Sequence, residues 1–278
     1  MQLKEIVDLI RYKQLIAILS YVLCVFVLAL ANNALDARRA LLVLVGTVAL
    51  FGASYGYNYI TDVKEDQIAG KNNPALNFKT TKIGLVLIVF TLVAVAVGII
   101  LGTLSLSLAL CILLLGFIYS HKSVRLKAKG WLKTVSVAFS WFLTYLFMLS
   151  VFPEISPLIG IFVGIFLVLI SIKGTILRDV LDMGGDERMK VQTVPIMLGK
   201  PKTTAFVMGV TVLQNLLLLG VVLALVLPIK FLLLLFVLPV RAAVIYGMQN
   251  EKYGIASKCS LLSYPLVAVV LYAVEVML

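Results

Sequence analysis

Nine long apolar runs, separated by short charged segments, constrain the fold of this chain more than any other feature. A helix needs about 20 mostly apolar residues to cross a bilayer, and nine runs with few or no charged residues have roughly that length. They cover residues 14–31, 40–60, 83–102, 104–119, 134–152, 157–177, 203–228, 229–247 and 255–277. With 62% hydrophobic and 13% charged residues, the composition excludes a soluble domain. The sequence predicts an all-α polytopic membrane protein, one domain over residues 1–278 with nine transmembrane helices.

Two of these runs allow an alternative interpretation. A basic start, an apolar run and Ala29-Leu30-Ala31 imitate a secretory signal peptide. However, the run of 18 residues is longer than the usual signal core of about 7–15 residues, so we expect it to remain as the first helix. The other case is the boundary at Pro228–Lys230, where one short polar break divides a very long apolar stretch.

The basic residues mark one side of the membrane. Lys and Arg concentrate on cytoplasmic flanks, and with the N-terminus inside, 21 of the 24 fall on inner segments, Lys173 and Arg241 among them. Only Arg38, Arg39 and Lys230 fall outside. The pattern predicts an integral membrane protein with a cytoplasmic N-terminus and the C-terminus on the opposite side. Because these residues lie between apolar runs, the net charge of +11 indicates contact with membrane lipids and no nucleic-acid partner.

The inventory of metal-binding side chains restricts the chemistry. There is one histidine, His121, and the three cysteines Cys24, Cys111 and Cys259 lack metal-ligand spacing. The sequence therefore indicates no zinc site, and a multi-histidine metal centre is excluded. Any reaction has to use carboxylates, basic groups and hydroxyls.

Seven of the 13 acidic residues lie in two short stretches, 58–66 and 178–188, at the predicted inner ends of the second and sixth spans. Acids near a bilayer are costly and tend to be functional. If the helices continue past the membrane plane, residues four apart share a face. This spacing aligns two sets of candidate catalytic residues: Asn58, Asp62 and Asp66 in the first stretch, and Asp179, Asp182 and Asp186 in the second.

Like charges at this spacing repel each other unless cations lie between them. Mg²⁺ prefers hard oxygen ligands and typically joins one or two carboxylates to substrate phosphates. We therefore expect Asp62, Asp66, Asp182 and Asp186 to bind Mg²⁺ as the cofactor and to hold a diphosphate between the two helices.

A diphosphate also needs cationic donors, because a leaving group gains charge as its bond breaks. The inner loops supply such residues, and Tyr119 adds a hydroxyl and an aromatic face beside them. The candidate substrate-binding residues are Lys71, Tyr119, Lys122, Arg125, Lys127 and Arg178.

At this point the pattern resembles the UbiA-type intramembrane prenyltransferase family, and the likeness covers most of the chain. The first family motif, Asn-Asp-x-x-Asp-x-x-x-Asp, is matched by Asn58, Asp62 and Asp66, with Tyr59 in place of its first aspartate. The second motif, Asp-x-x-x-Asp, is matched over residues 182–186. Each motif alone is weak, but their order at the ends of the right helices is specific.

Further segments support the resemblance, and some positions depart from it. Residues 193–199 and 119–127 are similar to two additional family motifs. Arg11 lies where many members have an arginine, so the resemblance adds it to the candidate substrate-binding residues. Asn73 stands where members commonly carry Arg or Lys before a proline, and Lys190 stands where a glycine is usual.

The resemblance implies Mg²⁺-dependent transfer of a polyprenyl group from an allylic prenyl diphosphate to a lipophilic acceptor, with release of diphosphate at the cytoplasmic side. The acceptor would be an aromatic quinone precursor or another lipid. Two alternatives remain: a UbiA-like terpene cyclase that acts on the same donor, and a membrane transporter. In either enzyme, Gly184-Gly185 would let a loop close over the site.

Overall fold

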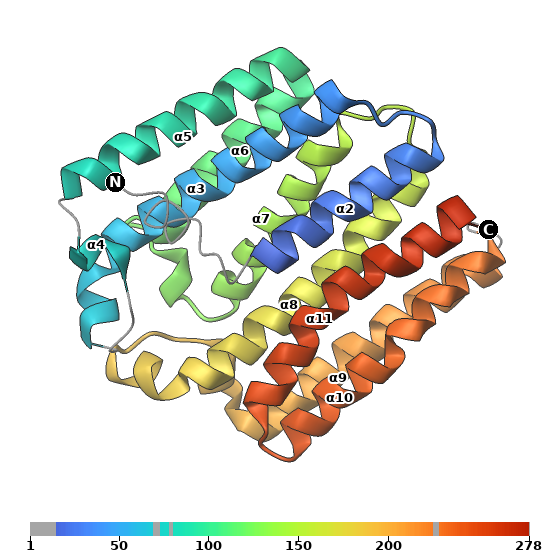
Figure 1. Ribbon diagram of the computed structural model, residues 1–278. Helices are drawn as coiled ribbons and strands as arrows, with labels where there is room; N and C mark the ends of the chain where they lie inside the picture. The colour runs from blue at the N-terminus through green and yellow to red at the C-terminus, as the bar shows by residue number, and fades with distance from the viewer. Residues whose placement is uncertain (1–14, 69–72, 78–79, 225–227, 278) are drawn as a thin grey trace.

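The described part of the chain is helical almost throughout. The computed structural model describes residues 15–68, 73–77, 80–224 and 228–277 (Figure 1). Its longer helices are α2 (Leu15–Ala31), α3 (Ala37–Ile68), α5 (Thr80–Leu101), α6 (Thr103–Ser120), α7 (Trp131–Leu149), α8 (Pro157–Arg188), α9 (Val194–Leu223), α10 (Leu238–Gln249) and α11 (Tyr253–Tyr272). Shorter elements are α4 (Pro74–Asn77) and η2 (Leu126–Ala128), together with η3 (Ile229–Val237) before α10 and η4 (Ala273–Met277) after α11.

The predicted all-α membrane architecture is confirmed. Eight helical segments in the described residues are long and apolar enough to cross a bilayer, and the shorter apolar helix Ile16–Ala31 lies within the first predicted span. The eighth predicted span begins as the 3₁₀ helix η3 and continues as α10. The ninth ends in the π-helical turn η4.

Two helices extend well beyond the predicted spans. α3 and α8 each contain 32 residues. At 1.5 Å per residue each is about 48 Å long, whereas the hydrocarbon core is about 30 Å thick. Their last turns carry both acidic stretches. Gly184 and Gly185 lie inside α8, so the predicted closing loop at these glycines is wrong.

One cluster of buried apolar side chains runs through the bundle from α2 to η4. α2 packs against α7, α8 and α11 (Figure 1). The Tyr21 hydroxyl lies 2.7 Å from Ser171 Oγ, and the Tyr264 hydroxyl donates to the same Ser171 oxygen at 3.1 Å. Because three helices meet at this hydroxyl group, it fixes α2, α8 and α11 relative to one another.

Two basic residues counted as inner-side charges are buried inside the bundle instead. Lys173 is 4% exposed and donates to Gln214 Oε1 at 2.8 Å. Arg241 is 2% exposed, bonds to Asn215, and lies 4.8 Å above the Phe166 ring. Subtracting these two from 21 leaves 19 inner residues against three, so the charge pattern still favours the same orientation.

The end of the bundle opposite the acidic stretches has its own small polar group. Arg39 donates to Glu154 at 2.7 Å and joins α3 to the segment between α7 and α8. This hydrogen bond holds the pKa of the Glu154 carboxyl below its usual value. The Asp36 carboxylate accepts from the Arg39 backbone N–H at 2.9 Å and caps α3.

The position of α3 depends on its close approach to α5. A Cβ added at Gly52 would lie 2.6 to 2.9 Å from the Phe90 ring, so we expect Gly52→Ala to destabilise the protein. The expected loss is about 1–3 kcal/mol, as for other overpacked sites. Gly84→Ala on α5 is the matched control, because a Cβ there meets nothing within 4 Å. Thermal unfolding in detergent measures both, and an unchanged Tm for Gly52→Ala would contradict this packing.

Candidate active site

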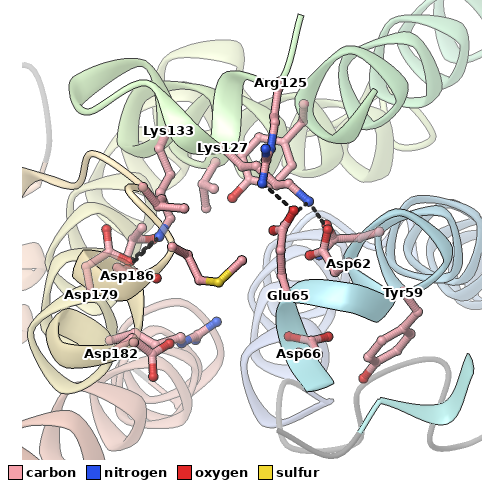
Figure 2. A pocket seen from close by; sticks show the side chains of 18 residues that line it. Tyr59, Asp62, Glu65, Asp66, Arg125, Lys127, Lys133, Asp179, Asp182 and Asp186 are labelled. Atoms are coloured by element: carbon pink, nitrogen blue, oxygen red, sulfur yellow. Dashed lines mark hydrogen bonds and ion pairs between the residues drawn. The ribbon is translucent and has the colours of Figure 1, made fainter. Parts of the chain in front are cut away.

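A cavity of about 450 Å³ lies between the last turns of α3 and α8. Both acidic sets predicted from the sequence line this cavity, because each helix continues far enough to carry its acids past the apolar bundle (Figure 2). The acidic and amide side chains in its wall are Asn58, Asp62, Glu65 and Asp66 from α3 and Asp179, Asp182 and Asp186 from α8.

The acids of α3 are paired with cations from the segment between α6 and α7. Lys127 in η2 is 8% exposed, forms an ion pair with Asp62, and has its Nζ 3.8 Å from Glu65 Oε2. Arg125 pairs with Glu65 as well (Figure 2). Two cations are thus held against the α3 wall, where they reduce the repulsion between the carboxylates.

The acids of α8 are paired with a cation from α7. Lys133 Nζ lies 2.7 Å from Asp179 Oδ1 and 3.9 Å from Asp186 Oδ2. Asp179 is 2% exposed, and its second oxygen has no hydrogen-bond partner among the described residues. Burial raises the pKa of the Asp179 carboxyl above its usual value, and the neighbouring Lys133 ammonium opposes this rise.

Asn73 connects the segment after α3 to the acidic helix. Its side-chain amide donates to Asp66 Oδ2 at 2.8 Å and to the Tyr59 carbonyl at 2.9 Å. Its side-chain oxygen accepts from the Ala75 backbone N–H at 2.8 Å. The residue that departs from the family pattern therefore has a positioning role, because it orients Asp66.

Asn58 is tied to the next helix of the bundle. It is 8% exposed, and its side-chain oxygen accepts from the Ser120 hydroxyl at 2.9 Å. Ser120 is the last residue of α6, directly after Tyr119, which also lines the cavity. This contact fixes the end of α6 against α3, so that Tyr119 lies beside the α3 acids.

The loop that carries Lys127 is held by strained backbone positions. Gly130 has φ 53°, and a Cβ there would lie 2.4 Å from the Met197 sulfur, so only glycine fits. The Gly130 N–H donates to the Gln192 carbonyl at 2.9 Å. Arg125 and Lys190 have φ 48° and 54°, the left-handed region that glycine adopts most easily. The glycine that the family resemblance implies at position 190 would adopt this conformation more easily than Lys190 does.

A second cavity of about 600 Å³ lies deeper in the bundle, among α2, α3, α6, α7, α8 and α11. Apolar and aromatic side chains such as Leu50, Phe51 and Trp141 form part of its wall. The two cavities share six lining residues: Asn58, Tyr59, Tyr119, Val137, Thr175 and Arg178. A polar chamber at the end of the bundle is therefore adjacent to a mostly apolar chamber inside it.

The carboxylates fit a metal that is shared with a substrate. In the part of the chain that the structure describes, no three carboxylate, histidine or cysteine side chains form a metal cage of their own. Instead the acids stand in two groups on two helices. Mg²⁺ commonly takes only one or two carboxylates and completes its coordination with water and substrate phosphates. Asp62, Asp66, Asp182 and Asp186 are suited to this kind of binding.

The structure does not bring all predicted site residues to the cavity. Arg125, Lys127, Arg178 and Tyr119 line it. Lys122 is exposed and is not among the described lining residues, while Arg11 and Lys71 lie outside the described residues.

Three site residues were missed by the sequence analysis. Glu65 had a usable signal, since it lies three residues after Asp62 and thus on a neighbouring part of the same helix face. Asn73 was noted only as a departure from the family pattern. Lys133 had no local signal, because its contact with Asp179 joins residues 46 apart.

A group of acids lies at the end of an apolar helical bundle. This arrangement is that of an intramembrane enzyme that binds a diphosphate attached to a hydrocarbon. The sequence profile of the UbiA prenyltransferase family matches residues 18–261, and the chain belongs to this family. It is an integral membrane prenyltransferase, so the transporter alternative does not hold. No curated protein matches the chain in sequence.

Solved structures share the fold over almost the whole length. A digeranylgeranylglyceryl phosphate synthase superposes with a TM-score of 0.72 at 20% identity, covering 99% of each chain. A UbiA homolog from Archaeoglobus fulgidus, bound to GPP and Mg²⁺, gives 0.71 at 16% identity and covers 98% of each chain. The apo UbiA homolog from Aeropyrum pernix K1 gives 0.74 at 16% identity, covering 94% of this chain and 97% of that one.

Proposed function

We propose that the protein transfers a polyprenyl group from an allylic prenyl diphosphate to a lipophilic acceptor, in a Mg²⁺-dependent reaction at the cytoplasmic end of the bundle. The observation that carries this proposal is the shared wall between the two cavities. A prenyl diphosphate has one highly charged end and one apolar end, and the two adjoining chambers match these ends. The Archaeoglobus fulgidus homolog bound to GPP and Mg²⁺ supports the same donor class.

The residues of the first cavity bind the diphosphate and counter its charge. Asp62, Asp66, Asp182 and Asp186 hold Mg²⁺, which supplies charge neutralisation to the diphosphate when it is bound. Lys127 lies at the same wall and donates hydrogen bonds to the phosphate oxygens. As the bond between C1 of the prenyl group and the diphosphate oxygen breaks, the electron pair stays on the diphosphate. Preorganised donors such as Lys127 stabilise this developing charge.

The second cavity keeps water away from the allylic cation. Phe51 and Trp141, with ring centroids 4.9 Å apart, both belong to its wall. Aromatic faces favour a cation, and an apolar chamber suppresses hydrolysis of the donor. A hydroxyl oxygen or an aromatic carbon of the acceptor then bonds to C1, and the acceptor loses its proton to the diphosphate or to water.

Acceptor dependence tests this proposal against the cyclase alternative. Purified protein is incubated with Mg²⁺ and farnesyl or geranylgeranyl diphosphate, with and without a panel of aromatic and glycerophosphate acceptors, and released diphosphate is measured. We expect release only when an acceptor is present, together with a prenylated product. Release without any acceptor would instead assign a cyclase or a hydrolase. No release under any condition would contradict a catalytic role for the acidic cavity.

A further inference from the structure

Two cations are buried together inside the bundle, away from the acidic cavity. Lys173 of α8 is 4% exposed and Arg241 of α10 is 2% exposed. Lys173 lies 13 residues before Asp186 on α8, which is roughly 20 Å along a helix that rises 1.5 Å per residue. Neither cation is among the described lining residues of the two cavities. These positive charges therefore need an explanation other than contact with the diphosphate.

The two cations surround one turn of α9. Lys173 Nζ donates to Gln214 Oε1 at 2.8 Å. Arg241 Nη1 donates to the side-chain oxygen of Asn215, the next residue of the same helix. Phe166 of α8 completes the group, since its carbonyl accepts from Gln214 Nε2 at 2.7 Å and its ring centroid lies 4.8 Å from the Arg241 guanidinium carbon. The two charges thus belong to one cluster, and they act on each other electrostatically.

The neighbours of this pair leave its charge unbalanced. In the part of the chain that the structure describes, neither Lys173 nor Arg241 forms an ion pair with a carboxylate. The amides and the aromatic ring that contact them carry dipoles but no net charge. A guanidinium group does not lose its proton in proteins, and a buried charge without a partner is strongly destabilising. At least the Arg241 charge therefore requires an anion.

The unused donors of Arg241 have the geometry of an anion site. Its Nη1 is bonded to Asn215, whereas its buried Nε and Nη2 have no hydrogen-bond partner among the described residues. These two N–H groups lie on one edge of the planar guanidinium and point the same way, which is how arginine binds an anion with two parallel hydrogen bonds. Each atom exposes less than 1 Å². This enclosure favours a small free ion over the headgroup of a lipid.

We propose that Arg241 and Lys173 bind one small inorganic anion, of the size of chloride, in a structural site formed by α8, α9 and α10. The Nε–H and Nη2–H groups of Arg241 donate to the ion, and the Lys173 ammonium group supplies the second positive charge. By balancing both charges, the ion holds α10 against α8 and α9. Because the site exists only in the folded bundle, the ion raises the free energy of unfolding as its concentration rises.

Thermal unfolding of the full chain in detergent tests this site. The protein is exchanged into sodium gluconate, and chloride or bromide then replaces gluconate at constant ionic strength. We expect the Tm to rise and to saturate with either halide. Arg241→Lys keeps the charge but loses the parallel donors, so it should raise the Kd for chloride about ten- to hundredfold.

Arg38→Lys is the matched control, because Arg38 is exposed on α3 at the opposite end of the bundle from the acidic stretches. Its response to halide should equal that of the wild type. A wild-type Tm that does not change with halide would overturn the proposal. An equal response in Arg241→Lys would overturn it as well, since the effect would then be a general one of salt on the protein.

A measurement on the wild type alone keeps the proposal testable if Arg241→Lys does not fold. Crystals grown in bromide should show an anomalous scattering peak beside Nε and Nη2 of Arg241, within reach of Lys173. Bromide found only at the protein surface would overturn the site. Lys173→Met provides a second variant, in which the Kd for chloride should rise because one of the two positive charges is lost. An unchanged Kd in this variant would contradict the role of Lys173.

Discussion

Asp182→Asn lowers Mg²⁺-dependent prenyl transfer by at least about a hundredfold, and Asp62→Asn does the same, while both proteins remain folded. The carboxylates at these positions lie on the two walls of the acidic cavity. Asparagine keeps the size of the side chain but removes the charge that attracts the metal and balances it. Loss of one preorganised electrostatic contact at a reacting group commonly costs about 10²–10³ in rate.

The control for these variants is Asp36→Asn, at the opposite end of the bundle. Asp36 caps α3 by accepting from the Arg39 N–H, and an asparagine oxygen caps a helix equally well. The variant should therefore retain full activity. Turnover is measured over a range of Mg²⁺ concentrations, with size-exclusion chromatography and thermal unfolding as checks on folding. Wild-type turnover in both Asp62→Asn and Asp182→Asn would refute the metal assignment.

Lys127→Ala raises the KM for the prenyl diphosphate about ten- to hundredfold. We expect the loss of free energy of donor binding to exceed the loss of free energy of folding. Lys127 is 8% exposed and lies at the α3 wall of the cavity, so its ammonium group is close to the position expected for the diphosphate. Hydrogen bonds to charged groups contribute about 1.5–3 kcal/mol, which corresponds to this range of affinity. Steady-state kinetics at saturating acceptor give the donor KM.

Lys122→Ala is the comparison, since this lysine belongs to the same loop but is exposed and is not among the described residues of the cavity wall. Its donor KM should equal that of the wild type. Lys127→Arg, which keeps the charge, should recover part of the loss. An unchanged donor KM in Lys127→Ala, or an equal increase in Lys122→Ala, would mean that the effect does not come from a phosphate contact in the cavity.

The acidic sets could be predicted because their pattern is local. Helical periodicity places residues four apart on one face whatever the rest of the protein does. Asp62 and Asp66, and likewise Asp182 and Asp186, therefore line the same cavity as the spacing predicted. The basic residues were harder to assign from sequence. A lysine in an inner loop fits a topology signal equally well, and only packing distinguishes the buried Lys127 from the exposed Lys122.

The charge pattern gave the wrong location for two basic residues, because it does not report burial. Lys173 and Arg241 lie within the predicted spans 157–177 and 229–247 and were counted with the inner-side charges, yet both are buried among α8, α9 and α10 with amide partners. A hydropathy analysis identifies apolar runs. A single cation inside such a run is then counted with the nearest inner segment. Whether such a cation is buried depends on polar partners from other helices, such as Gln214 for Lys173.

The sequence by itself determined that this is a helical membrane protein, which family it resembles, and which carboxylates belong together. Hydrophobic length and helical spacing are properties of the local chain, so they can be read without the fold. Only the tertiary structure decided that Lys133 pairs with Asp179, that Asn73 orients Asp66, and that a second cavity adjoins the acidic one. These features arise where separate helices and loops pack together, and no local pattern encodes that packing.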